Sequence, residues 1–467
     1  MPVKTYISVI LPLKLEWKPC YSIPEGTPEG GVVVGDRVKV TFAGKSYSGV
    51  VSATGIATDT APSKIKPFDS IEEGLERILP EEIRLWKMVA EYYMCTVGEV
   101  YKAAYPVSKI NLEEAHAAAV TRANERQTRL LEVMRQKVGR IEERLTKKEN
   151  LATKAKEGTK SKAKYIEETI KIRQELEIAV AALKNAEEKA SRDSLKTSSD
   201  IPQFQPVSLT QAQKSAFDEI HAAFVNGKPV LIQGVTGSGK TEIYVRLAQE
   251  ALNNGRNVLY LVPEIALSRQ LEDRLSEHFG ESLMVFHSAE TAASRRATAE
   301  AIRRSNGYIV LGTRSSLFLP HHDLGLIVVD EEHDNSYKQD SPAPYYNGRD
   351  TALMLSVIHS NCNIILGSAT PSLEERYNCL TGKHKLVELK ERYHGSNDSD
   401  IEIIDTKVER RKNGMVGNFS RKLIAYMEKA LGNGEQIMIL RSRRSWAPLL
   451  QCESCGSMPK CPHCNVS

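Results

Sequence analysis

The sequence has no long hydrophobic segment and little net charge. Its 467 residues contain no apolar run near the roughly 18 residues that a membrane-spanning helix needs. Residues Met1 to Tyr6 do not form the apolar core of a signal peptide. The net charge of +4 does not by itself demand a nucleic-acid partner. We therefore expect a cytoplasmic protein without membrane contact, built from roughly three or four domains.

Cysteine is also scarce, and half of it is concentrated near the C-terminus. Four of the eight cysteines are scattered along the chain: Cys20, Cys95, Cys362 and Cys379. The other four form two Cys-x-x-Cys pairs, namely Cys452 with Cys455 and Cys461 with Cys464. This spacing predicts zinc half-sites. Only five residues separate the two pairs, fewer than in a self-contained four-cysteine site, so we expect each pair to share its zinc with ligands elsewhere.

A glycine-rich segment predicts the phosphate-binding half of a nucleotide site. Residues 234–241 read Gly-Val-Thr-Gly-Ser-Gly-Lys-Thr, between an apolar run and a helical stretch. That is the strand–loop–helix context of a phosphate-binding loop. The residues expected to contact the nucleotide are Gly234, Thr236, Gly237, Ser238, Gly239, Lys240 and Thr241. Lys240 would reach the β- and γ-phosphates, and the Thr241 hydroxyl would bind Mg²⁺.

An acidic segment predicts the catalytic half of the same nucleotide site. Asp330-Glu331-Glu332-His333 ends an apolar run. Asp330 would hold Mg²⁺ through water, and Glu331 would orient or deprotonate the attacking water. Gln213, which precedes the glycine-rich loop, has the paired donor and acceptor needed to read the adenine edge. The sequence therefore predicts ATP and Mg²⁺ as cofactors.

The N-terminal half of the chain changes composition twice. Residues 1–106 contain short β-like runs separated by Gly and Pro, which predicts a small β-rich domain. Residues 107–200 carry heptad-like patterns on both sides of Gly158, which predicts a coiled-coil-like helical hairpin and a linker. Between 121 and 170 there are 14 Lys and Arg against 8 Asp and Glu. This excess suits either a DNA-facing arm or a solvated surface, and the solvated surface is the commoner explanation.

The C-terminal half has the pattern of an α/β protein. Apolar runs alternate with helical stretches over residues 201–395, which together with the glycine-rich loop predicts a P-loop NTPase lobe with a parallel sheet. The strands are expected at 230–232, 258–262, 309–311, 326–329 and 364–366. A further apolar run at 436–440 predicts the start of a second lobe over 396–450. Residues 451–467 would form a partial zinc-binding segment.

Polar loops follow several of these strands. Residues 261–268 and the segment around Arg314 offer amides, hydroxyls and a guanidinium that suit the phosphates of a single strand. Ser368 and Thr370 follow the next strand and can hydrogen-bond the acidic motif, with His333 as the expected partner. Such contacts would couple the state of the ATP to the position of the lobe.

Together these motifs resemble the PriA family of bacterial primosomal helicases, which are superfamily 2 motors that move 3′ to 5′. The resemblance rests on residues 261–268, 330–339, 367–372 and the cysteine pairs, and more loosely on a 3′-DNA-binding domain at 1–106. It implies an ATP-dependent helicase that recognises stalled or branched forks and restarts replication by promoting primosome assembly. Implied partners are forked and single-stranded DNA, single-stranded DNA-binding protein, and proteins that load the replicative helicase.

The resemblance also implies residue roles. An aromatic loop after the acidic motif would touch DNA through Tyr337, Tyr345, Tyr346 and Arg349, and Lys64 would help to hold the DNA 3′ end. In the family, four Cys-x-x-Cys pairs interleave to hold two zinc ions. This sequence departs from the family in having the helical hairpin in place of a winged helix. It also has Cys20 where some relatives have an acidic residue.

The sequence ends before most of the second lobe and before the two later cysteine pairs of the family. We therefore expect a truncated chain or a fragment that binds ATP and DNA but hydrolyses ATP poorly. The alternative to a helicase is an ATP-gated DNA-binding scaffold without unwinding activity. A restriction-type translocase subunit has less support, because the sequence carries no nuclease motif.

Overall fold

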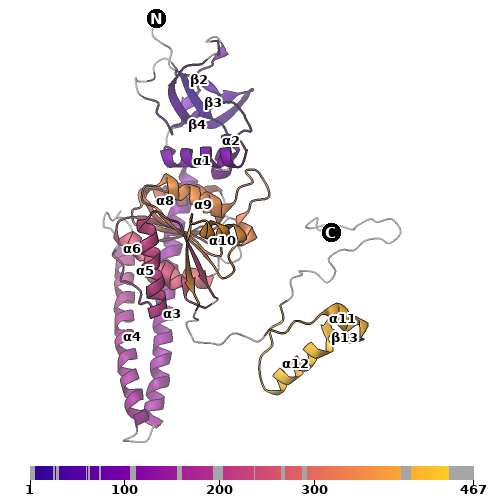
Figure 1. Ribbon diagram of the computed structural model, residues 1–467. Helices are drawn as coiled ribbons and strands as arrows, with labels where there is room; N and C mark the ends of the chain where they lie inside the picture. The colour runs from indigo at the N-terminus through magenta and orange to yellow at the C-terminus, as the bar shows by residue number, and fades with distance from the viewer. Residues whose placement is uncertain are drawn as a thin grey trace. The chain divides into compact units, whose positions relative to one another are not determined.

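The computed structural model describes thirteen parts of the chain, which form two compact units, Met1–Ser396 and Asn397–Ser467. The described residues are 6–24, 27, 31–58, 60–61, 64–72, 75–105, 112–154, 160–192, 203–235, 237–263, 269–286, 292–390 and 401–440. The first unit contains a β-rich domain, a helical hairpin and an α/β domain with a parallel sheet (Figure 1). The predicted fold class is therefore confirmed for these parts, whereas the zinc segment lies outside the described residues.

The N-terminal domain is a five-stranded antiparallel sheet with two helices. The strands are β1 (Tyr6–Ile10), β2 (Cys20–Ser22), β3 (Arg37–Phe42), β4 (Lys45–Ile56) and β5 (Ser70–Ile71), in the order β2-β1-β4-β3-β5. Ala43 and Gly44 both have positive φ, which is the backbone that a two-residue hairpin between β3 and β4 requires. Helices α1 (Pro80–Tyr92) and α2 (Val97–Ala104) follow, and Trp86 of α1 is fully buried.

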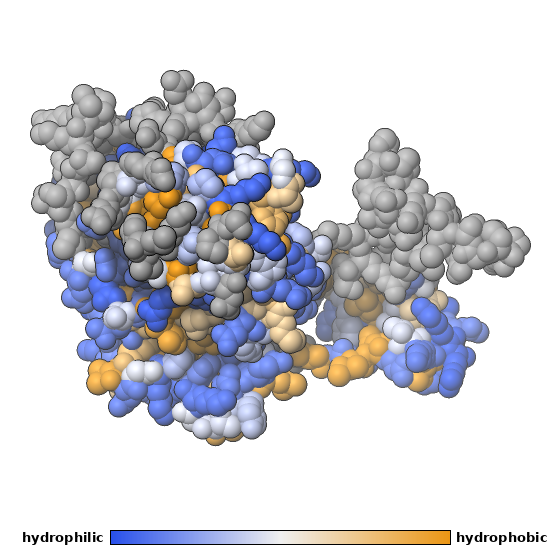
Figure 2. Space-filling view, turned by 90° about the horizontal axis from the view of Figure 1, so that it is seen from above, coloured by the Kyte–Doolittle hydropathy of each residue, from blue (hydrophilic) through white to orange (hydrophobic). Residues whose placement is uncertain are grey.

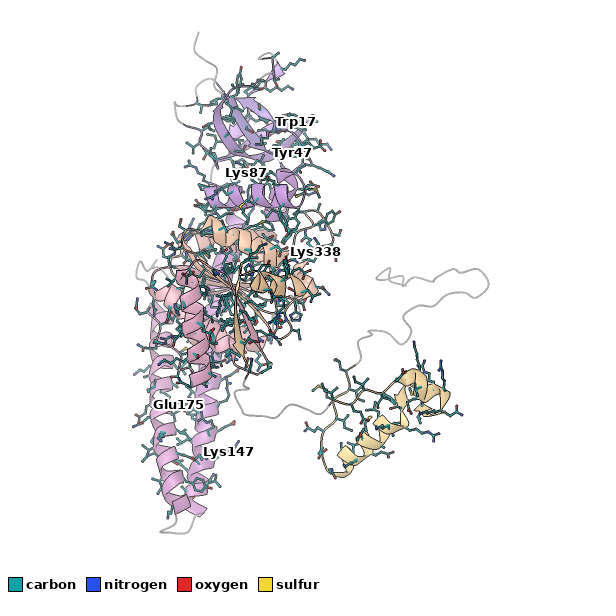
Figure 3. All side chains as sticks on the ribbon, in the orientation of Figure 1. Trp17, Tyr47, Lys87, Lys147, Glu175 and Lys338 are labelled. Carbon is teal, nitrogen blue, oxygen red and sulfur yellow. The ribbon has the colours of Figure 1, made fainter. Side chains whose placement is uncertain are left out.

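The hairpin consists of α3 (Leu112–Lys154) and α4 (Lys160–Arg192), which lie side by side (Figure 1). The first helix ends at Lys154 and the second begins at Lys160, and the predicted interruption at Gly158 lies between them, outside the described residues. Buried Ile141 and Ile172 lie on the predicted apolar rows. Lys147 and Glu175 are labelled on α3 and α4 in Figure 3. Ion pairs link the two helices: Arg144 with Glu175 at 3.3 Å, Lys148 with Glu168 at 2.6 Å and Arg173 with Glu149 at 2.7 Å. Part of the basic excess is therefore neutralised within the hairpin.

The α/β domain is built on a seven-stranded parallel sheet, as the continuous apolar runs predicted. The strands are β6 (Val230–Gly234), β7 (Asn257–Leu261), β8 (Leu283–Phe286), β9 (Ile309–Gly312), β10 (Leu324–Val329), β11 (Asn363–Ser368) and β12 (Lys385–Leu389). Their order is β12-β6-β11-β10-β7-β9-β8. The carboxyl ends of β6, β11 and β10 are therefore neighbours, and the loops that follow them meet at one edge.

Helices cover both faces of this sheet, because successive strand residues are buried in two separate clusters. Leu231 and Ile327 belong to one cluster, and Ile232 and Val328 belong to the other. The α-helices are α5 (Gln211–Val225), α6 (Lys240–Asn253), α7 (Arg269–Phe279), α8 (Ala292–Arg304), α9 (Gly348–Ile358) and α10 (Leu373–Leu380). The described residues also include three short 3₁₀ helices: η2 (Gly280–Ser282) after α7, η3 (Arg314–Phe318) after β9 and η4 (Asn335–Tyr337) after β10.

A buried ion pair joins the N-terminal domain to the α/β domain. Arg303 of α8 lies 2.9 Å from the Glu82 carboxylate of α1, and the two side chains are 10% and 3% exposed. The same guanidinium donates to the Tyr105 hydroxyl at 2.9 Å. Helix α1 also packs on α9, and the Tyr93 hydroxyl donates to Asn347 O at 3.4 Å. These contacts fix the end of α1 beside the loop that follows the acidic motif.

The described residues on the face of the first unit that Figure 2 shows are mostly hydrophilic. Seen from above, hydrophobic residues form small separate patches among hydrophilic ones (Figure 2). Within the described ranges, no helix combines the length and the apolar character needed to cross a bilayer.

The second unit contains α11 (Thr406–Arg411), a short hairpin of β13 (Met415–Val416) and β14 (Phe419–Ser420), and α12 (Arg421–Gly432). The run 436–440, predicted to open a second parallel sheet, forms no strand. Met438 and Leu440 are 96% and 95% exposed. A strand requires a hydrogen-bonded neighbour, and the described part of this unit offers residues 436–440 none.

Candidate functional site

The glycine-rich loop leaves β6 at Gly234 and ends where α6 begins at Lys240. Gly237 and Gly239 have φ of 79° and 81°, a left-handed conformation that glycine adopts without strain. A Cβ at Gly234 would lie 2.5 Å from Ser238 Oγ and 3.0 Å from Lys240 Cγ. The loop therefore curls tightly around the N-terminus of α6, where amide groups and the helix dipole favour a phosphate.

Lys240 lies between the two halves of the predicted nucleotide site. Its Nζ donates to Gly234 O at 3.0 Å and lies 3.8 Å from Glu331 Oε1. The buried Ser238 hydroxyl has no hydrogen-bond partner among the described residues. A Lys ammonium and an unsatisfied hydroxyl in a tight glycine loop fit a nucleotide phosphate. Thr241 follows Lys240 in the first turn of α6, and Thr236 lies outside the described residues.

Gln213 is buried against the phosphate-binding loop. Its Nε2 donates to Ser238 O at 3.4 Å and to Gly239 O at 3.3 Å, while its Oε1 accepts from Thr210 N at 2.9 Å. The side chain thus caps α5 and braces the loop in this structure. Reading of the adenine edge by Gln213 stays a prediction.

Asp330 and Glu331 follow β10, and Asp330 is the more enclosed of the two. The hydroxyls of Tyr244 and Tyr260 lie 3.4 Å from its two carboxylate oxygens. Burial, and secondarily the charge of Glu331, raises the pKa of the Asp330 carboxyl to about 6. A bound Mg²⁺ would supply the positive charge that favours the ionised carboxylate. Neither tyrosine was singled out from the sequence, since tyrosine on an apolar helix or strand is ordinary core composition.

The predicted coupling residues lie together. Ser368 Oγ lies 2.7 Å from His333 Nδ1, and Thr370 Oγ1 lies 3.4 Å from His333 Nε2. The loop after β11 therefore contacts the acidic motif directly. His333 Nδ1 is also 3.6 Å from Glu331 Oε2, so this contact reaches the predicted catalytic carboxylate.

A buried polar network lies behind the acidic motif. Glu332 accepts from Ser372 N at 2.7 Å and from Ser372 Oγ at 2.9 Å. Arg349 Nη1 lies 3.2 Å from Glu332 Oε2, and Arg349 Nε lies 3.6 Å from Glu375 Oε1. His384 Nδ1 is 2.6 Å from Glu375 Oε2. The network connects the acidic motif, the loop after β11 and the start of α9, and no residue spacing in the sequence marks it.

Some of the residues predicted to contact DNA are exposed, and others are buried. Lys64 and Tyr345 are exposed, Tyr345 by 53%. Tyr337, Tyr346 and Arg349 are only 1%, 2% and 9% exposed, so their side chains do not present a stacking or phosphate-binding surface. This corrects the prediction for these three residues.

Internal partners explain why these residues are buried. The Tyr337 hydroxyl donates to Asp330 O at 2.7 Å, and Tyr346 packs on Phe318 with ring centroids 5.1 Å apart. Arg314 is partly exposed, but its Nη1 donates to Ser336 O at 2.6 Å and to Lys338 O at 2.8 Å. Arg314 thus holds the aromatic loop in this structure, and contact with DNA stays a prediction.

The predicted zinc ligands Cys452, Cys455, Cys461 and Cys464 lie outside the described residues. Within the part of the chain that the structure describes, no group of three or more His, Cys, Asp and Glu side chains is arranged to hold a metal ion. Zinc binding by the four cysteines therefore stays a prediction.

Two family models match the parts of the chain that carry this geometry. Residues 210–378 match the DEAD/DEAH box helicases, and residues 8–106 match the 3′DNA-binding domain of PriA. The first match contains the phosphate-binding loop and the acidic motif, and the second contains the antiparallel sheet with α1 and α2. The α/β domain is therefore a helicase domain, joined to a 3′ DNA-binding domain.

Curated relatives name the particular protein that this chain resembles. The chain is 30% identical to the replication restart protein PriA of Chlamydia pneumoniae over 485 residues, which is 99% of this chain and 61% of that protein. It is 44% identical to PriA of Rickettsia typhi over 55% of this chain and 39% of that protein. For PriA of Bacillus subtilis the identity is 36%, over 56% of this chain and 32% of that protein. The chain is a homologue of the replication restart protein PriA, and it spans between 32% and 61% of these relatives.

Solved helicase structures are more distant. The DUF1998 helicase MrfA bound to DNA matches with 21% identity and a TM-score of 0.28, over 41% of this chain and 31% of that chain. RecG bound to a three-way DNA junction matches with 21% identity and a TM-score of 0.29, over 44% of this chain and 25% of that chain.

Proposed function

We propose that this chain forms the ATP-binding and 3′-end-binding part of a DNA helicase that moves 3′ to 5′ and restarts replication at stalled or branched forks. The observation that carries the proposal is that Lys240 Nζ lies 3.8 Å from Glu331 Oε1 at one edge of a parallel sheet. This edge belongs to a helicase domain that follows a 3′ DNA-binding domain in the same chain.

The residues at this edge suit hydrolysis of the terminal phosphate of ATP. Lys240 and the amides at the start of α6 would bind the phosphates, while Thr241 and Asp330 would hold Mg²⁺, which neutralises charge on the phosphoryl group. Glu331 would orient and deprotonate the attacking water. His333 contacts both Glu331 and Ser368, which provides a route from the hydrolysed phosphate to the loop after β11.

The cellular role is proposed from the relatives' name, replication restart protein PriA. The partners would be forked and single-stranded DNA, single-stranded DNA-binding protein, and proteins that assemble the primosome and load the replicative helicase. Zinc held by Cys452, Cys455, Cys461 and Cys464 completes the proposed cofactors with ATP and Mg²⁺. Because each Cys-x-x-Cys pair is expected to share its zinc with ligands elsewhere, we expect zinc in this chain to be substoichiometric or weakly held. Metal analysis after dialysis against a mild chelator tests this, and one tightly retained zinc that is lost when any of the four cysteines is changed contradicts it.

The proposal is tested with phosphate release and strand separation measured on the same preparation. We expect Lys240→Ala to abolish ATP turnover and leave DNA affinity nearly intact, because Lys240 contacts phosphates of the nucleotide and not of the DNA. Turnover that survives in Lys240→Ala overturns the assignment of the site. ATP-dependent change in DNA affinity without strand separation supports the alternative, an ATP-gated DNA-binding scaffold.

A further inference from the structure

A pocket lies between the N-terminal domain and the aromatic loop of the helicase domain. Its volume is about 550 Å³, within the range of sites that bind small molecules or short polymer segments. The walls come from the segment 9–19, Ser52 of β4, the end of α1 and the turn to α2. Ala343 and Tyr345 of the helicase domain complete it. Lys64 is not among its lining residues.

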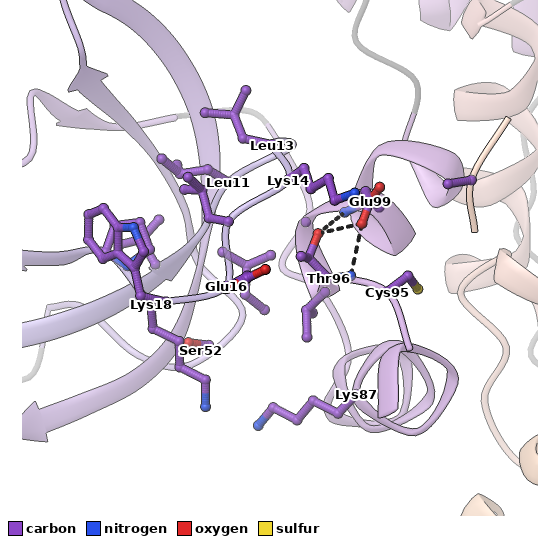
Figure 4. Close-up of a pocket in the computed structure, with 18 of the residues that line it drawn as sticks. Leu11, Leu13, Lys14, Glu16, Lys18, Ser52, Lys87, Cys95, Thr96 and Glu99 are labelled. Atoms are coloured by element: carbon purple, nitrogen blue, oxygen red, sulfur yellow. Dashed lines mark hydrogen bonds between the residues drawn. The ribbon is translucent and has the colours of Figure 1, made fainter. Parts of the chain in front are cut away.

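The pocket carries lysines without carboxylate partners. Lys14, Lys18 and Lys87 line it, and none of them forms an ion pair with a described residue. In Figure 4 the ammonium groups of Lys18 and Lys87 reach into the pocket from opposite walls. Two cations facing the same space repel each other, and an anion between them removes that repulsion.

The acidic residues of the pocket cancel only part of this charge, because two glutamates, Glu16 and Glu99, stand against three lysines. Glu16 is exposed, and the carboxylate of Glu99 is held by the start of α2. Glu99 Oε2 accepts from Thr96 N and from Thr96 Oγ1, both at 2.9 Å (Figure 4). The remaining walls are apolar, with Leu11 and Leu13 among them. An anionic ligand with flat or apolar parts fits this lining better than a free phosphate does.

Each of the two domains contributes an exposed aromatic side chain to the lining of the pocket. Trp17, from the N-terminal domain, is 58% exposed and contacts Phe42 with ring centroids 5.8 Å apart. Tyr345, from the helicase domain, is 53% exposed. Lys338 Nζ lies 5.4 Å from the ring centroid of the lining residue Tyr93 and donates to Tyr345 O at 2.6 Å. Figure 3 labels Trp17 and Lys87 in the N-terminal domain and Lys338 in the helicase domain.

We propose that this pocket, which we call the Trp17–Tyr345 groove, binds a segment of single-stranded DNA between the 3′ DNA-binding domain and the helicase domain. Lys18 and Lys87 contact the phosphates, and Trp17 and Tyr345 stack on bases. Alternation of cations and exposed aromatic faces is the pattern of sequence-tolerant single-strand sites. The inference rests on the proposed function, because it assumes that the chain binds DNA. An acidic peptide is the competing occupant, but it would not use the two exposed aromatic faces.

The first test measures the salt dependence of binding to an oligo(dT) of about 15 nucleotides. Lys18→Ala/Lys87→Ala should weaken binding roughly tenfold, and the slope of log affinity against log salt should fall by about 1.4, which is about 0.7 for each lost phosphate contact. Lys39→Ala/Lys45→Ala removes two exposed lysines of the same domain outside the groove, and both quantities should stay unchanged. Circular dichroism of each variant confirms that the fold is retained.

A second test monitors tryptophan emission during titration with the same oligonucleotide. Stacking of a base on Trp17 should quench the emission of the parent chain, and Trp17→Phe should abolish that quenching while leaving affinity within a few-fold. Trp17→Ala should weaken binding roughly tenfold. Equal quenching in the parent chain and in Trp17→Phe overturns the role of Trp17.

Two outcomes separate this proposal from the proposed function. If the parent chain binds no single-stranded DNA, both fail. If it binds DNA and the groove variants match the lysine controls in affinity and salt slope, only the groove fails.

A poly-Asp peptide that competes with the oligonucleotide for Trp17 in the parent chain, but not in Lys18→Ala/Lys87→Ala, confirms that the groove attracts anions. If the peptide quenches the emission of Trp17 and oligo(dT) does not, the choice of DNA as the occupant is overturned.

Discussion

Arg349 Nη1 lies 3.2 Å from Glu332 Oε2, with the guanidinium 11% exposed and the carboxylate fully buried. Glu332 follows Glu331, whose φ of 47° is unusual for a residue with a side chain. Glu332 N also donates to Gly367 O at 3.0 Å, so both the backbone and the side chain of Glu332 are anchored. The ion pair thus helps to hold Glu331 in a conformation that it would not adopt freely.

We expect Arg349→Met to lower the free energy of unfolding by about 3 kcal/mol, because it leaves the buried Glu332 carboxylate unpaired. Chemical denaturation at neutral pH measures this. In a double-mutant cycle, Arg349→Met combined with Glu332→Gln should cost less than the sum of the two single changes. Arg144→Met, which breaks the exposed pair with Glu175 on the hairpin, is the control and should cost no more than about 1 kcal/mol. Equal costs at Arg349 and Arg144 would contradict the role of the buried pair.

The strands and the two motifs could be predicted because their signals are local. Continuous apolar runs gave β6, β7, β9, β10 and β11, and the glycine-rich and acidic motifs placed Lys240 and Glu331 on the same site. Strands β8 and β12 were not predicted. They stand at the two edges of the sheet. Strand β12 mixes apolar and charged residues, and β8 is an apolar run of only four residues, which periodicity alone does not distinguish from a buried helix segment. The hairpin was predicted because two long heptad patterns surround one polar interruption.

The roles of Arg349, Tyr337 and Tyr346 could not be predicted from composition. An arginine and two tyrosines in a polar loop suit DNA binding as well as burial, and only the tertiary partners decide between them. For Arg349 those partners are Glu332, in the segment after β10, and Glu375 of α10. For Tyr337 the partner is a backbone carbonyl, which no sequence pattern marks.

Glu331→Gln should bind ATP normally and hydrolyse it at least about a hundredfold more slowly, because the amide keeps the shape but cannot act as a base. Calorimetry for nucleotide affinity and a phosphate-release assay for turnover measure the two effects. Glu374→Gln, in the exposed first turn of α10, is the matched control and should change neither. A Glu331→Gln protein that fails to bind ATP would indicate a structural role for the carboxylate.

His321 should make stability depend on pH. Burial lowers the pKa of His321 to about 3, and its Nε2 donates to Ser316 O at 2.8 Å. The unfolded chain binds a proton at this residue below about pH 6.5 and the folded chain does not. Stability is therefore full above that pH and falls as the pH drops, by up to about 1.4 kcal/mol per unit.

Replacing His321 by Gln should remove this part of the pH dependence while keeping a donor for Ser316. Urea denaturation of the parent chain and of His321→Gln between about pH 7 and pH 5 gives the difference in slope. His221, a partly exposed residue of α5, provides the control, since His221→Gln removes a histidine that is not enclosed. Parallel pH profiles for the parent chain and His321→Gln would contradict the prediction.

Tyr337 lies at the start of the aromatic loop, and its hydroxyl donates to Asp330 O at a distance of 2.7 Å. We therefore expect Tyr337 to link this loop to the nucleotide site. Tyr337→Phe keeps the buried ring and removes this hydrogen bond, at a cost of about 1 kcal/mol in stability. We expect ATP affinity and basal hydrolysis to be retained and the stimulation of hydrolysis by single-stranded DNA to fall several-fold. Tyr377→Phe, on an exposed residue of α10, should leave the stimulation unchanged. If Tyr337→Phe lowers the basal and the DNA-stimulated rates by the same factor, Tyr337 supports the site without transmitting the presence of DNA.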